Sequence, residues 1–172
     1  MCIRDRVNIA GQATLRGDAQ IRLGDTGGDL FNAGSININS NNHIDIFENS
    51  SMLLVGTNTA GTADLTSFGD IEDGPNASFN VVFTAGFFGD NVYIGDTDTD
   101  EFNAGTLYFE AFGDMFINED SGTNIVERKN FANRLMLSSP LSITDDDTAA
   151  IEVTTLAPVS YTHLTLPTIC SV

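Results

Sequence analysis

The chain has no tryptophan and few basic residues. Its 172 residues include 7 Lys and Arg against 24 Asp and Glu, which gives a formal net charge of −17. Binding to phosphate backbones needs clustered Lys and Arg, so this balance argues against a nucleic-acid partner. No apolar run approaches the ~20 residues of a membrane span, and we expect no span in this segment. These scarcities favour an acidic protein whose surface charges repel one another.

The two cysteines, Cys2 and Cys170, lie near the termini, which differ from the rest of the chain. A nucleotide sequence that encodes residues 1–6 is the reverse complement of one that encodes residues 159–163. This relation resembles a sequencing-library adapter translated in both directions. We therefore expect residues 1–6 and 158–172 to be adapter-derived artefacts outside the fold. On this interpretation the remainder is an internal piece of a longer reading frame, and it offers no disulfide or thiolate–metal site.

The segment between the termini repeats itself with a period of roughly 71 residues. Residues 24–34 return as residues 95–105 with eight of eleven positions identical. Further pairs follow, among them Ile36 with Leu107, Glu48 with Glu119, and Asn58 with Asn130. The sequence therefore predicts the end of one repeat at 7–23, a complete repeat at 24–94 and a second, nearly complete repeat at 95–157.

Apolar residues alternate with polar ones inside each repeat, which is typical of short strands with one buried face. The alternating apolar sets include Ile36/Ile38, Ile44/Ile46, Phe79/Val81/Phe83, Val92/Ile94, Leu107/Phe109 and Ile151/Val153. Gly-Asp and Ala-Gly pairs separate these sets and indicate turns. The sequence therefore predicts an all-β chain.

Three rounds of strand and turn per repeat give roughly 24 residues per round, which suits one coil of a β-solenoid. We predict a right-handed parallel β-helix of about six coils, with inward apolar ladders and with Asn and Asp on the solvent face. Residues 71 or 72 positions apart should then occupy equivalent places three coils apart. The alternative is a tandem array of small β-sandwiches, which lacks the buried tryptophan and tyrosine-corner cues of immunoglobulin-like domains.

The motifs Ala104-Gly105-Thr106-Leu107-Tyr108-Phe109 and Gly113-Asp114-Met115-Phe116-Ile117 recur in degenerate form along residues 7–157. This array resembles the repeats of filamentous-haemagglutinin-type proteins, of autotransporter passengers and of very large surface proteins of environmental bacteria. The resemblance implies a secreted or surface-displayed β-helical stalk or adhesin. It implies no catalytic residue.

The sharpest local feature is the acidic turn Asp96-Thr97-Asp98-Thr99-Asp100-Glu101. Carboxylates at alternate positions of a turn can wrap Ca²⁺. The turn departs from an EF-hand loop, however, because Glu101 and Leu107 stand where Gly and Glu are required. The equivalent turn at 25–29 lacks the middle carboxylate. A solvated acidic turn is therefore favoured, and calcium binding by Asp96, Asp98 and Asp100 is kept as the alternative.

Other candidate residues are better explained by structure than by chemistry. His43 has Asp114 as its counterpart in the next repeat, so we expect a solvent-facing position. Glu48 and Glu119 could form a carboxylate pair for glycoside hydrolysis, but residues that recur with the period usually serve a turn. Arg128, Lys129 and Arg134 are too sparse for nucleic acid. We assign no catalytic, cofactor-binding or metal residue.

These observations favour a structural stalk or adhesin-like segment of a giant exported bacterial repeat protein, at the cell surface or outside the cell. It would extend and present a surface to a host or matrix partner, whether carbohydrate or protein. Exposed coil ends would favour self-association. The alternatives are a fragment of a β-helical polysaccharide-active enzyme and a calcium-dependent extracellular scaffold.

Overall fold

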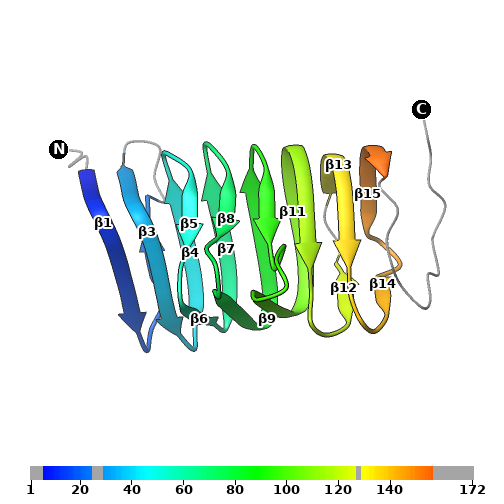
Figure 1. Cartoon of the computed structure of the whole chain (residues 1–172), viewed down its shortest axis with the longest axis horizontal. Coiled ribbons are helices and arrows are strands. Elements are labelled where there is room, and N and C mark those ends of the chain that lie inside the picture. Colours follow the sequence, from blue (N-terminus) through cyan, green and yellow to red (C-terminus); the bar gives the residue numbers. More distant parts are fainter. Residues whose placement is uncertain (1–5, 25–28, 127–128, 157–172) are drawn as a thin grey trace.

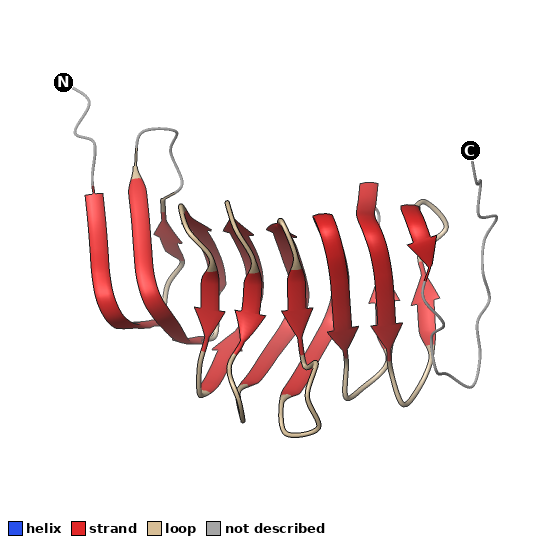
Figure 2. Ribbon diagram, turned by 45° about the horizontal axis from the view of Figure 1, so that its top comes forward, coloured by secondary structure: helices blue, strands red, loops and turns tan. Residues whose placement is uncertain are grey.

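The computed structural model describes residues 6–24, 29–126 and 129–156, which form a stack of parallel β-coils (Figure 1). Figure 2 shows strands and loops and no helix in the described residues. The strands are β1 (Arg6–Gly17), β2 (Ile21–Leu23), β3 (Leu30–Ser40), β4 (His43–Glu48), β5 (Met52–Leu54), β6 (Thr57–Ala60), β7 (Thr62–Ser67), β8 (Ile71–Asp73), β9 (Ser78–Gly89), β10 (Val92–Ile94), β11 (Glu101–Asn118), β12 (Thr123–Ile125), β13 (Lys129–Ser138), β14 (Ile143–Asp145) and β15 (Ala150–Leu156).

Strands pair only with strands of neighbouring coils, and every pairing in the described residues is parallel. The result is a β-solenoid of about seven turns, which confirms the predicted all-β parallel coil. Paired residues lie 18 to 24 positions apart, as in Ile36–Leu54 and Val7–Phe31. The coil length expected from the sequence is therefore the upper limit of the observed lengths, and the expected number of coils is one too low.

Inward side chains form apolar ladders along the solenoid axis. One ladder follows β5, β8, β10, β11 and β13 through Met52, Ile71, Val92, Met115 and Leu135. The aromatic rings of Phe79, Phe87 and Phe102 pack together at centroid separations of 5.8 to 6.3 Å. Each fully buried side chain of this size contributes roughly 1.5–3 kcal/mol.

The sequence repeat does not coincide with whole coils. Ile36 and its counterpart Leu107 are both fully buried, as predicted. The ladder of Ile36, however, continues through Leu54 in β5 toward β8 and β10. The ladder of Leu107 instead runs back through Ala85 in β9 and Ala63 in β7. The two residues thus belong to different ladders, and the expectation of equivalent places three coils apart is wrong. Because most coils are shorter than expected, the period spans about three and a half coils and carries equivalent residues to opposite sides.

Phe83 is the clearest error in the predicted facing. Its side chain is 63% exposed, although it continues the alternation of Phe79 and Val81. The register between β9 and β11 shifts at this point, so that Val82 and Phe83 lie opposite the single residue Gly105. Such a bulge reverses the facing of the residues that follow it. Asn80, between Phe79 and Val81, and Glu152, between Ile151 and Val153, are exposed, as the alternation of apolar and polar residues predicts.

The recurring Ala-Gly motif lies at a corner where successive coils approach closely. A Cβ atom on Gly34, Gly61 or Gly105 would lie 2.6, 2.4 or 2.6 Å from a carbonyl oxygen of the preceding coil. Only glycine fits against a backbone this close. The motif therefore marks the corner of the coil, where the sequence predicted a turn.

Candidate functional sites

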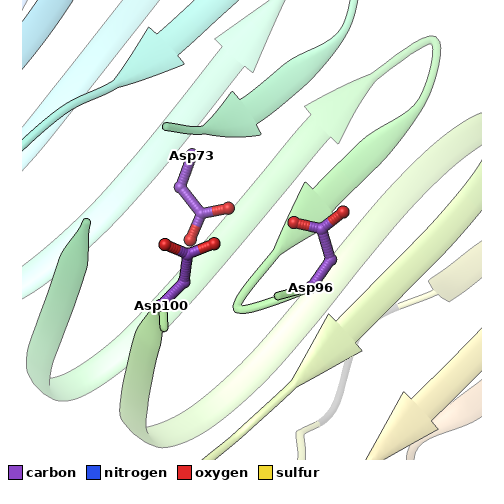
Figure 3. Close-up of side chains that lie close together, drawn as sticks. All are labelled: Asp73, Asp96 and Asp100. Atoms are coloured by element: carbon purple, nitrogen blue, oxygen red, sulfur yellow. The ribbon is translucent and has the colours of Figure 1, made fainter. Parts of the chain in front are cut away.

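The acidic turn after β10 brings two of its carboxylates close to a third from the preceding coil. Oxygen atoms of Asp73, Asp96 and Asp100 all lie within 4.8 Å of one another. Figure 3 shows the three side chains converging from the end of β8 and from both ends of the turn. Asp98, which the sequence grouped with Asp96 and Asp100, is exposed and lies outside this cluster.

Hydrogen bonds from the backbone fix two members of the cluster. The Gly95 amide donates to Asp73 Oδ2 at 2.9 Å, and the Ala77 amide donates to Asp100 Oδ1 at 3.2 Å. The Thr97 hydroxyl also donates to Asp100. Asp73 Oδ1 is buried and has no hydrogen-bond partner among the described residues. Burial, and then the nearby Asp100 and Asp96 carboxylates, raise the pKa of Asp73 to about 6.

This arrangement concentrates hard oxygen ligands of the kind that Ca²⁺ takes. The acidic site predicted from the sequence did not include Asp73. The missing information was the coil length, because it determines which turns of neighbouring coils lie side by side. Residues 25–28 of the equivalent turn lie outside the described residues.

Glu48 and Glu119 are buried glutamates that join one coil to the next. Glu48 Oε1 accepts a hydrogen bond from the Ala33 amide at 2.8 Å, and Glu119 Oε1 accepts one from the Ala104 amide at 3.0 Å. Both side chains are at most 1% exposed. Burial raises the pKa of each, against hydrogen bonds that lower it. The bond to a backbone amide of the preceding coil is common to both, which supports a structural role in the repeat.

Two asparagines play the same part elsewhere in the repeat. Asn58 accepts a hydrogen bond from the Ile38 amide at 2.8 Å, and its counterpart Asn130 accepts one from the Phe109 amide at 3.0 Å. Both are fully buried, which corrects the expectation that Asn lies on the solvent face. A buried amide without a partner is costly, so these side chains satisfy the backbone where the sheet ladder is interrupted.

His43 lies on the outer face of β4, half-buried, and belongs to a short polar row. Its Nε2 atom is 3.8 Å from Asp64 Oδ2, and the Tyr108 hydroxyl donates to Asp64 Oδ1. The Tyr108 ring crosses Gly86, where a Cβ atom would lie 2.2 Å from it, and this contact explains why Tyr108 is buried. The row spans four successive coils, β4, β7, β9 and β11, on the outside of the solenoid.

Only one side chain of the basic cluster Arg128, Lys129 and Arg134 lies within the described residues. Arg128 lies outside the described residues, and so does the side chain of Lys129. The Arg134 guanidinium covers the Phe116 ring at 5.0 Å from the ring centroid and lies 3.6 Å from the Asp114 carboxylate.

The predicted artefact segments 1–6 and 158–172 fall outside the described residues, except that the exposed Arg6 begins β1.

Comparison of the chain with protein-family models, with curated proteins and with solved structures finds no match. Within the described ranges no helix is long and apolar enough to cross a membrane.

Proposed function

We propose that this chain is a structural spacer, a stalk or adhesin-like segment of a large exported bacterial repeat protein, with no catalytic activity of its own. The observation that carries the proposal is the use of the recurring polar residues. Glu48 and Glu119, and Asn58 and Asn130, each bond a backbone amide of the preceding coil. A sequence that repeats these bonds extends a rod by addition of further repeats, because each coil contacts only its neighbours.

A display experiment tests the spacer role. One or two copies of the full chain would be placed between a membrane anchor and a fluorescent epitope on a bacterial surface. With about seven coils at the ~4.8 Å strand spacing, each copy should raise the epitope by about 30 Å. An unchanged height would contradict the proposal. Release of sugar from neutral or acidic polysaccharides by the purified chain would instead favour the polysaccharide-active enzyme.

The second candidate function is a calcium-dependent extracellular scaffold. It is favoured by the convergence of Asp73, Asp96 and Asp100 and by the unpartnered Asp73 Oδ1. A cation that binds only the folded state raises the melting temperature. On this hypothesis Ca²⁺ should raise the melting temperature of the full chain relative to EDTA.

Two variants make the calcium test specific. Asp73→Asn removes a charge from the cluster, whereas Asp98→Asn removes the same charge from an exposed position of the same turn. The scaffold hypothesis expects the calcium response to be lost in Asp73→Asn and kept in Asp98→Asn. An equal response in the two variants, or none in the wild type, would rule out this cluster as the calcium site.

A further inference from the structure

A hollow of about 580 Å³ lies on the outer face of β10, β11 and β13, beside the acidic turn. Small-molecule sites commonly fall in the range of roughly 300–1,000 Å³ and combine an apolar floor with a few polar groups. Outward side chains of three successive rungs, Tyr93, Phe116 and Met136, provide the apolar floor. The polar edge contains Asp96, Asp98 and Asn118.

Neighbouring side chains already cover part of the surface of both aromatic rings. Tyr93 and Phe116 stack on each other with their centroids 5.5 Å apart, and the Arg134 guanidinium covers Phe116 at 5.0 Å. A ligand in the hollow would therefore contact the uncovered ring surface and the flexible Met136 side chain. Such contacts provide dispersion attraction to the C–H surface of a saturated ring.

The surroundings of the hollow are negatively charged. Burial, and then the carboxylates of Asp114, Asp70 and Glu72, raise the pKa of the Tyr93 phenol, and the Arg134 guanidinium opposes them. Asp96 and Asp98 are exposed, and within the described part of the chain no hydrogen bond reaches their side chains. Together with the net charge of −17, this rim favours a cationic ligand and disfavours acidic glycans.

We propose that the hollow binds a segment of a glycan that carries free amino groups. The apolar floor packs against the C–H surface of a pyranose ring, and the Asp96 and Asp98 carboxylates accept charge-assisted hydrogen bonds from its ammonium groups. The proposal rests on the proposed attachment role and names the class of partner. Binding and rod length are measured separately, so either can fail without the other.

Calorimetry of the full chain with a glucosamine hexamer at pH 6 and 0.15 M NaCl tests the proposal. The N-acetylated hexamer shares the sugar backbone but lacks the charges, and hexalysine has the charges but no sugar rings. We expect the glucosamine hexamer to bind about tenfold more tightly than either probe. Hexalysine binding as tightly would overturn the site in favour of nonspecific attraction between polyions, and so would the absence of glucosamine binding.

Matched variants localise the binding. Asp96→Asn with Asp98→Asn should weaken glucosamine binding about tenfold. The control Asp18→Asn with Asp147→Asn removes the same net charge from exposed positions outside the hollow and should leave binding unchanged. Met136→Ala should weaken binding, whereas Phe88→Ala, which removes an aromatic ring that does not line the hollow, should not. Equal effects of the test and control variants would overturn the assignment.

Discussion

At the residue scale, buried carboxylates give the fold a specific dependence on pH. Glu48 and Glu119 have raised pKa values in the folded chain because burial penalises their charged forms. The folded state therefore holds their protons to higher pH than the unfolded state does. Their contribution to stability is fully present at acidic pH and is lost as the pH rises through the raised pKa values.

Glu119→Gln tests this sign. Glutamine keeps an acceptor for the Ala104 amide but does not titrate, so the fall in unfolding free energy with rising pH should be shallower than in the wild type. Glu119→Ala leaves that amide without its acceptor and should cost about 1–3 kcal/mol at every pH. Urea unfolding between pH 4 and pH 8 measures both. An unchanged slope in Glu119→Gln would show that this carboxyl does not contribute to the pH dependence.

Glycine at the coil corner gives a second residue-scale prediction. Gly105→Ala places a Cβ atom 2.6 Å from the Phe83 carbonyl oxygen, whereas Gly11→Ala meets nothing within 4 Å. We expect Gly105→Ala to destabilise the chain by about 1–3 kcal/mol, as overpacking does. Gly11→Ala should change stability by less than about 1 kcal/mol. Equal midpoints of thermal unfolding for the two variants would contradict the close approach of the coils.

At the element scale, the facing of most strands could be predicted from the sequence, but their stacking could not. Alternation with a period of two identified Ile36 and Leu107 as inward and Asn80 as outward, because facing is a local property. The bulge that turns Phe83 outward leaves no local signal in the sequence, because the glycine that lies opposite it, Gly105, belongs to the next coil.

The candidate acidic site shows the same division between local and non-local information. Asp96 and Asp100 lie in one turn, so the sequence could group them. Their contact with Asp73 depends on the length of the coil between them. Paired residues of neighbouring coils lie 18 to 24 positions apart, and no sequence period reports that variation directly.

Spin labels can test the half-coil offset between the repeats. Asp45 and Phe116 are 71 positions apart, whereas Asp45 and Tyr108 share an outer row through Asp64 and Gly86. Labels at 45 and 108 should be separated by three rungs, or about 14 Å. Labels at 45 and 116 should lie clearly farther apart, on opposite sides of the rod. The labels are attached to cysteines introduced at these positions in a chain whose Cys2 and Cys170 are replaced by Ser. A 45–116 distance shorter than the distance expected for opposite sides of the rod, and close to the 45–108 distance, would support the three-coil alignment instead.

At the scale of the whole molecule, charge and open edges act against each other. Among the described strands, β1 and β15 each pair on one side only, and their Ile9, Ile151 and Val153 side chains are only partly buried. Edge pairing between copies is therefore expected, opposed by a net charge of −17.

Salt should shift this balance toward association, because the Debye length falls from about 30 Å at 0.01 M to about 8 Å at 0.15 M. Light scattering of the full chain across this range should show growing assemblies. A monodisperse monomer at every salt concentration would contradict the self-association expected from the coil ends.

The central claim is that the chain is a rod that lengthens by repetition. Insertion of a second copy of residues 24–94 after residue 94 tests it most directly, with small-angle X-ray scattering as the measurement. The added repeat of about three and a half coils should lengthen the particle by about 17 Å at an unchanged cross-section. A particle that grows in width, or a second domain that tumbles on a flexible joint, would contradict the account.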